Sequence, residues 1–341
     1  MRRSLLSSTL ILATGLLGCG ADSEESEMGA SFQAALLTAG PVSDAGWYAG
    51  AYEGLMLLQD SLGASVSHQQ TRTPAEFDEA FLSYASSGYD LVFAHGFEYQ
   101  DAAMRAGEQF PNTTFVVSGG AQSTENVVPL IFRLEEATYL AGMVAGGMSE
   151  SGIVGMVGGV EIPPVQGTFR AFEAGARAVN PDVQILESFT GDWDDVGAAK
   201  EAAAAQLSQG ADVLIHNVDA GSFAVFQAVR EAVEAGGTAW ALGMNRDQND
   251  VAPDVILGSA VIRIPQAFRA TAEAWSAGDL GGAPIYTGAN QGVIDFVLNP
   301  ALLERLPEEL RDAIDAARVQ IRAGELRVPR VAYVEGETGG P

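Results

Sequence analysis

From Phe32 to about residue 245, short apolar runs alternate with longer segments in which apolar residues recur at helical spacing. The short runs predict β-strands at 32–39, 64–70, 90–95, 114–120, 153–159, 183–190, 212–218 and 238–245. The longer segments predict α-helices at 47–63, 74–88, 98–110, 135–149, 164–180, 195–210 and 220–237. Alternation of this kind is typical of parallel sheets with helices on both faces. The pattern therefore predicts the α/β class.

The alternation consists of two series with a similar layout. Residues 158–176 repeat the arrangement of residues 39–55, in which a strand leads through a glycine-bearing loop into an amphipathic helix. The repetition predicts two similar lobes, and about 310 residues suit two cores better than one. Further elements that return to complete the lobes are predicted at 256–262, 264–278, 293–298 and 307–324. The expected lobes are 32–130 plus 248–285 and 131–247 plus 286–330.

The N-terminus has the features of a bacterial lipoprotein signal. Two arginines precede an apolar run at 5–17, which is shorter than the roughly 20 apolar residues of a membrane-spanning helix. The run ends in Leu-Leu-Gly-Cys, and Cys19 is the only cysteine in the sequence. We expect a signal peptide at 1–18, lipidation of Cys19 and a polar, acidic tether at 19–31. The alternative is an ordinary secretory signal followed by a chance cysteine.

Charge and motif content favour a binding protein over an enzyme. The formal net charge is −26 at pH 7, which excludes nucleic acid as a partner, because binding it requires Lys and Arg to neutralise phosphates. The sequence contains no Walker A, GxSxG or HExxH motif. His68, His95 and His216 are too scattered along the sequence to indicate a metal site. We expect no catalysis, cofactor or metal, and an enzyme on this scaffold is the competing hypothesis.

In open α/β sheets, ligands bind beyond the carboxyl ends of the strands, so the loops at those ends form the candidate site. The loop after the first strand carries Asp44, Trp47 and Tyr48 beside the start of a helix. The loop after the third strand carries Gly96, where backbone can approach a ligand, and Phe97, whose ring can face it. The alternatives are that Asp44 caps the helix, Trp47 packs on it, and Phe97 belongs to the core.

The second series carries the same residue types at the same edge. Trp193 lies among carboxylates, Asp219 ends a strand, and Phe223 lies one turn into the next helix. Asn245 and Asp247 follow the last strand of the series. The alternatives are that the two aspartates cap helices and that Phe223 is core. Aromatic rings beside carboxylates favour a planar, hydroxylated ligand, because rings stack on a base and carboxylates accept from ribose hydroxyls.

With these loops, the chain resembles the basic membrane protein family of substrate-binding lipoproteins, which serve ATP-binding-cassette (ABC) importers. The resemblance is carried by residues 40–55, 93–117, 133–181, 189–221 and 241–248. It implies a type I periplasmic-binding fold, with two Rossmann-like lobes, three crossovers and a hinged ligand cleft. It also implies a purine nucleoside or related ligand, an ABC permease and ATPase as partners, and a monomer held in the cell envelope by its lipid. A ligand sensor for a membrane receptor, or a binder of a free base, sugar or other small polar solute, is the alternative.

The resemblance also assigns roles to individual residues. Asp44 aligns with the family's aspartate in the first loop, and Trp47 aligns with the aromatic residue that commonly stacks on the base. Asp247 aligns with the acidic residue of the family's GxDxDQ segment, which implies a ribose contact. The sequence departs from the family at Asn245, which replaces the first aspartate of that segment, and at Ile262, where many members carry lysine. Both departures lie on the ribose side of the implied site.

Overall fold

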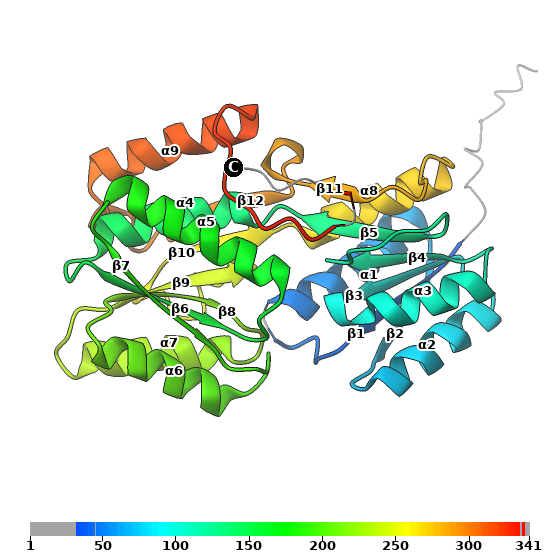
Figure 1. The fold of residues 1–341 in the computed structure, drawn as a ribbon, viewed down its shortest axis with the longest axis horizontal. Helices are drawn as coiled ribbons and strands as arrows, with labels where there is room; N and C mark the ends of the chain where they lie inside the picture. Colours follow the sequence, from blue (N-terminus) through cyan, green and yellow to red (C-terminus); the bar gives the residue numbers. More distant parts are fainter. Residues whose placement is uncertain (1–31, 45, 335, 338–341) are drawn as a thin grey trace, which may run out of the picture. The chain divides into compact units, whose positions relative to one another are not determined.

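The computed structural model describes residues 32–44, 46–334 and 336–337. They form a first lobe and a second lobe, each built on one six-stranded sheet (Figure 1). The first sheet has the order β11 (Ile285–Thr287), β5 (Val127–Phe132), β4 (Thr114–Ser118), β3 (Leu91–His95), β1 (Gln33–Thr38) and β2 (Ser65–Gln70). The second has the order β12 (Ile294–Leu298), β10 (Ile256–Ile262), β9 (Trp240–Asn245), β8 (Val213–Asn217), β6 (Ile153–Gly158) and β7 (Gln184–Phe189). The strands pair in parallel except β12, which is antiparallel to β10.

Helices cover both faces of each sheet (Figure 1). The first lobe contains α1 (Trp47–Leu62), α2 (Pro74–Ser86), α3 (Gln100–Gln109) and α8 (Ile264–Ser276). The second contains α4 (Glu135–Met148), α5 (Pro163–Val179), α6 (Val196–Ser208), α7 (Ser222–Glu234) and α9 (Glu308–Ala323). Local signals set several helix starts. Thr73 and Glu76 form a capping box ahead of α2, and the Asp195 carboxylate accepts from the Ala198 N–H at the start of α6.

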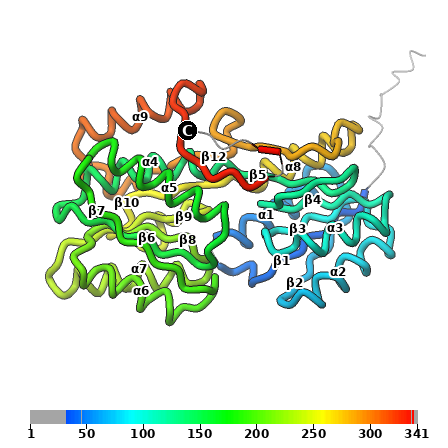
Figure 2. Tube along the Cα trace, viewed as in Figure 1, coloured from blue at the N-terminus to red at the C-terminus, as the bar shows by residue number. Residues whose placement is uncertain are grey.

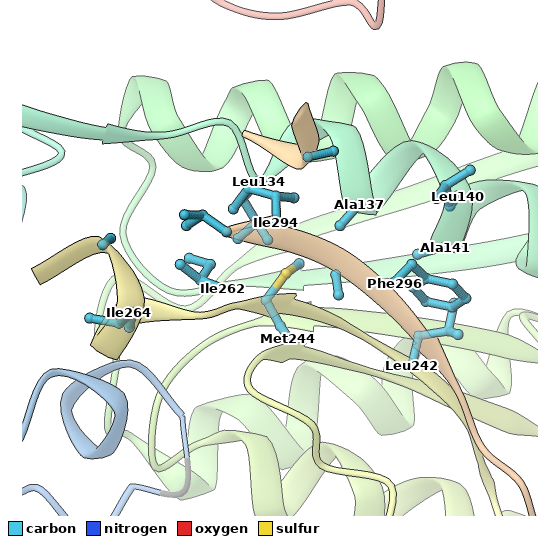
Figure 3. Close-up of a cluster of buried hydrophobic side chains, with 14 of the residues drawn as sticks. Leu134, Ala137, Leu140, Ala141, Leu242, Met244, Ile262, Ile264, Ile294 and Phe296 are labelled. Carbon is cyan, nitrogen blue, oxygen red and sulfur yellow. The ribbon is translucent and has the colours of Figure 1, made fainter. Parts of the chain in front are cut away.

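The sheets are buried on both faces, as parallel sheets usually are. In β1, Ala34 and Leu36 pack with the residues of α1 and α8, whereas Ala35 and Leu37 pack with those of α2 and α3. In the second lobe, α4 lies on β8, β10 and β12, and Figure 3 shows part of the core beneath it. The buried side chains labelled there are Leu134, Ala137, Leu140, Ala141, Leu242, Met244, Ile262, Ile264, Ile294 and Phe296.

The predicted α/β alternation is confirmed, and the predicted strands and helices agree with the observed bounds to within a few residues. The two lobes also repeat one topology, because β2-β1-β3-β4-β5 and β7-β6-β8-β9-β10 have corresponding orders. The repeat seen between 39–55 and 158–176 therefore marks equivalent strand–loop–helix units.

Three features of the sheets differ from the sequence prediction. Strand β10 lies in the second sheet, although 248–285 was expected in the first lobe. Strand β5 was not predicted because Pro129 interrupts its apolar run, and proline lacks the N–H that a central strand needs. Pro129 is tolerated because β11 pairs with β5 only from Leu130 onward. Strand β11 was also missed, since it has only three residues.

The chain passes between the sheets three times, after β5, after β10 and between β11 and β12. Three connections between two lobes are what the resemblance implied. Along the described residues, no helix is long and apolar enough to cross a membrane. The predicted signal peptide, the lipidation site Cys19 and the tether 19–31 lie outside the described residues.

Candidate ligand-binding cleft

A cavity lies between the lobes, at the carboxyl ends of strands from both sheets. Its walls include Gly96 after β3, Phe132 at the end of β5, Asn217 at the end of β8 and Asn245 at the end of β9. The empty space within the cavity and at its open mouth amounts to about 870 Å³, part of which is open to solvent. The cavity therefore lies at the edge of the sheets that the loop residues indicated.

On the first lobe, the wall is aromatic. Trp47, Tyr48, Gly96 and Phe97 all line the cavity. The Trp47 ring stacks on the His95 ring, with centroids 3.8 Å apart and planes 27° apart, and meets Phe132 edge-on at 5.7 Å. These contacts fix the orientation of the Trp47 ring, which keeps it in place as part of the wall.

Asp44 shapes this wall without lining the cavity. Its buried carboxylate accepts hydrogen bonds from the backbone N–H groups of Gly46 (3.2 Å), Tyr48 (2.8 Å) and Ala49 (2.8 Å). It therefore caps the start of α1, which was the alternative interpretation of this residue. By fixing this turn, Asp44 orients Trp47 and Tyr48 toward the cavity.

The wall on the second lobe is more polar. Trp193, Asp219 and Asn245 line the cavity, together with Asn217 and Thr168. Asn245 has a φ of 67°, in the left-handed region that few residues other than glycine adopt. Such strain is common at ligand sites, where the surrounding structure holds it in place. The amide of Asn217 donates to the Thr168 hydroxyl at 3.2 Å.

Phe223 and Asp247 do not line the cavity. The Phe223 side chain is 42% exposed on α7, because its position on the helix faces away from the sheet. Asp247 is exposed, and its carboxylate accepts from the Asn249 N–H at 3.0 Å, which makes it part of a local turn. Ile262, the position aligned with the family lysine, lines the cavity as an apolar residue.

Several cavity residues have no signal in the sequence. Arg133 follows β5, Glu135 begins α4, and Arg330 and Tyr333 lie in the C-terminal segment. They belong to no predicted strand-end loop with an aromatic–carboxylate pattern. Only the fold brings them to the cavity.

The cavity has an acidic side and a charge-balanced side. On the acidic side, burial raises the pKa of Asp219 well above its usual range, and the nearby carboxylates of Asp44, Asp194 and Glu98 raise it further. On the other side, Arg133 lies 3.6 Å from Glu135 and 2.9 Å from Glu337. A ligand with several hydrogen-bond donors would match the acidic side.

These buried carboxyls predict that the protein without ligand loses stability as the pH rises. Burial raises the pKa of Glu135 from 4.5 to about 7, with Arg133 partly opposing it, and the pKa of Asp219 is also raised. A group with a raised folded-state pKa stabilises the fold fully below its unfolded-state pKa, and this contribution is lost as the pH rises through the folded-state value. We expect the free energy of unfolding in urea to fall from about pH 5 to about pH 8 by on the order of 1–3 kcal/mol. Glu135→Gln should flatten this decline, and a wild-type stability that rises over the same interval would contradict the prediction.

No group of three or more metal-ligating side chains able to hold a metal ion occurs among residues 32–44, 46–334 and 336–337. The histidines have separate partners, since His68 contacts the Thr38 hydroxyl, His95 contacts Ser118, and His216 contacts Gln248.

Residues 32–327 match the model of the Bmp family, described as PnrA-like ABC transporter substrate-binding proteins. The chain belongs to this family. This match confirms the resemblance to the basic membrane protein family. Members of the family are solute-binding proteins that associate with membranes outside the cytoplasm.

Proteins similar to this chain are named for different functions. A purine-binding protein of Brucella abortus is 27% identical over 314 residues, covering 91% of this chain and 85% of that protein. The transcriptional activator protein Med of Bacillus subtilis is 27% identical over 297 residues, covering 86% of this chain and 89% of that protein. A solute-binding protein of an ABC transporter system from Aeropyrum pernix has a TM-score of 0.80 at 21% identity, covering 87% of this chain and 92% of that one. The fold of this PnrA-like protein is the type I periplasmic-binding fold.

Proposed function

We propose that this PnrA-like protein binds a purine nucleoside, or a closely related purine compound, in the cleft between its lobes. The observation that carries the proposal is the pairing of aromatic residues with buried hydrogen-bond acceptors in one cavity. Trp47 lines the first lobe and Trp193 the second, while Asp219 and Asn245 line the polar wall. Membership of a substrate-binding family and similarity to a purine-binding protein support the same ligand class.

The cleft matches the two chemically different parts of a nucleoside. Aromatic faces such as that of Trp47 favour a flat base, and stacking of this kind contributes about 1–3 kcal/mol per base. Carboxyl and amide oxygens, as on Asp219 and Asn245, accept from ribose hydroxyls or ring N–H groups. A nucleoside is uncharged, which suits a site where burial already disfavours ionisation of Asp219.

The ligand is proposed to pass to an ABC permease and its ATPase. Anchoring of a monomer through lipid at Cys19, with residues 19–31 as a tether, would hold the protein near the permease on the periplasmic or outer side of a membrane. Catalysis is not part of the proposal, since the family is one of solute binders. Unchanged nucleoside after prolonged incubation with the protein is the expected result, and turnover that Asp219→Asn abolishes would instead indicate an enzyme.

Sensing is the second candidate function. It is favoured by the similarity to a transcriptional activator protein, which shows that this scaffold also occurs in proteins named for regulation. A sensor and an importer use the same cleft and differ in what the liganded protein contacts. Genes for a permease and an ATPase beside the gene for this protein would favour import.

A thermal-shift panel tests the ligand class. The protein is first unfolded and refolded to remove carried-over ligand, and is then heated with purine nucleosides, free bases or sugars. A ligand at about one hundred times its Kd adds about 2.7 kcal/mol to the stability of the folded state, which raises the melting temperature. We expect the largest shift with a purine nucleoside. A shift with a sugar and none with any purine compound would overturn the nucleoside assignment.

A further inference from the structure

The C-terminal segment after α9 forms part of the ligand cleft. Helix α9 ends at Ala323 and is capped by Gly324, and we name residues 327–334 with 336–337 the C-terminal strap. The strap runs back from α9 over α5 toward the first lobe, as the red segment in Figures 1 and 2 shows. It is continuous with the second lobe through α9 and has no helix or strand of its own.

Contacts with both lobes hold the strap in place. On the second lobe, its backbone lies against α5, where a Cβ on Gly167 would be 3.6 Å from the Val331 nitrogen. On the first lobe, the Tyr333 ring meets the Phe97 ring edge-on at 6.4 Å. Between the lobes, Arg133 donates to the Glu337 carboxylate at 2.9 Å. The strap is therefore packed on the molecule on each side of the cleft.

Three strap residues line the cavity itself, namely Arg330, Val331 and Tyr333. The Nε–H of Arg330 is buried and has no hydrogen-bond acceptor among the described residues. Its closest acidic neighbour is the Glu337 carboxylate, 3.8 Å from Nε, which balances the charge without forming a hydrogen bond. The Arg330 side chain as a whole is 33% exposed where it lines the cavity, so its terminal N–H groups are the ones that can donate to an acceptor on a ligand.

The charged groups around the strap indicate whether the acceptor on the ligand is charged or uncharged. Glu337 lies within 4 Å of both Arg133 and Arg330, and Glu135 lies 3.6 Å from Arg133, so acidic groups offset much of the positive charge that could attract an anion. An uncharged acceptor, such as a carbonyl oxygen, fits better. Two lining rings, Phe97 and Tyr333, meet edge-on and provide apolar surface beside such a group.

Apart from residue 327, the strap follows the residues that match the family. The family match ends at residue 327, whereas the lining residues of the strap begin at Arg330. A difference at this wall can change ligand preference while the rest of the cleft stays the same.

We propose that the C-terminal strap is a specificity-determining part of the ligand site, in which Arg330 donates to a carbonyl oxygen of the ligand and Tyr333 packs beside the ring that bears it. The inference rests on the proposed binding of a purine nucleoside. It predicts a preference for purines with a ring carbonyl, such as inosine and guanosine, over adenosine, which has an amino group in the corresponding place.

Calorimetric titration of inosine, guanosine and adenosine into the refolded protein tests this assignment. Arg330→Ala should weaken binding of inosine and guanosine by roughly tenfold or more and change adenosine binding little, because it removes a donor that only the carbonyl uses. Arg330→Gln, which keeps a shorter donor, should have an intermediate effect. Arg327→Ala is the matched control, since Arg327 is an exposed arginine of the same strap. It should bind all three nucleosides as the wild type does.

The outcomes separate this proposal from the proposed function. Wild-type affinity of Arg330→Ala and Arg330→Gln for all three nucleosides would overturn the role of the strap and leave nucleoside binding intact. Equal weakening of all three would overturn the assignment of Arg330 to a carbonyl. Failure of the wild-type protein to bind any nucleoside would overturn the proposed function and this inference together. Circular dichroism melting of each variant ensures that the compared proteins are folded.

Discussion

Replacing Trp47 with alanine should weaken nucleoside binding by about 1–3 kcal/mol, or roughly 5- to 150-fold in Kd. Trp47 lines the cavity from the start of α1, and stacking on His95 at 3.8 Å holds its ring in one orientation. A ring fixed in this way stacks on a base with little loss of side-chain freedom. Trp47→Phe keeps an aromatic face and should recover part of the affinity. Both values are measured by calorimetric titration.

The control for this experiment is a tryptophan outside the cleft. Trp275 packs on Phe32 at 5.3 Å in the first lobe and does not line the cavity. Trp275→Ala should lower the melting temperature and leave the affinity unchanged. Wild-type affinity in Trp47→Ala would show that this ring serves packing alone.

The largest effect on stability is expected for Gly175→Ala. Gly175 of α5 faces α4 at backbone contact, and a Cβ there would lie 1.9 Å from the Tyr139 carbonyl oxygen. The opposing Gly142 of α4 is similar, with a Cβ position 2.0 Å from the Phe172 carbonyl oxygen. Since neither backbone can yield without moving a helix, we expect a loss of at least about 2 kcal/mol in the free energy of unfolding, despite the higher helix propensity of alanine.

A glycine with open surroundings provides the comparison. A Cβ at Gly281 would meet no atom within 4 Å, and the residue is exposed. Gly281→Ala should change the free energy of unfolding in urea by no more than about 0.5 kcal/mol. Equal stability of the Gly175→Ala and Gly281→Ala variants would contradict the close packing of α4 on α5.

The fold was largely predictable because the strands and helices of parallel α/β sheets each have a hydrophobic pattern that is visible in the sequence. Strands buried on both faces appear as apolar runs, and the helices between them have their own period. The exceptions have local causes. Pro129 concealed β5, and β11 is too short to show a period. The assignment of β10 to a sheet depends on pairing between distant strands, which no local pattern specifies.

The candidate site was predictable where it depends on strand ends. Trp47, Phe97, Trp193 and Asp219 lie on loops after strands, and the fold brings these loops together at the cavity. Residue type alone does not show whether a side chain points inward. Asp44 has the chemistry of a ligand contact, yet its carboxylate is occupied by three backbone N–H groups.

Other parts of the site depend on long-range packing. Phe223 is placed outside the cavity by the orientation of α7, and Asp247 by the turn that follows Asn245. Arg330 reaches the cavity only because the C-terminal strap returns from α9 across the lobes. The strap has no helical or strand periodicity, so its path back to the cleft could not be predicted from the sequence.

Purine nucleoside binding in the cleft is tested most directly by a calorimetric titration of inosine into the refolded protein. We expect saturable binding of one nucleoside per chain, weakened in Trp47→Ala and unchanged in Trp275→Ala. The absence of binding by inosine, guanosine and adenosine to the folded protein would contradict the claim that this cleft is a purine nucleoside site.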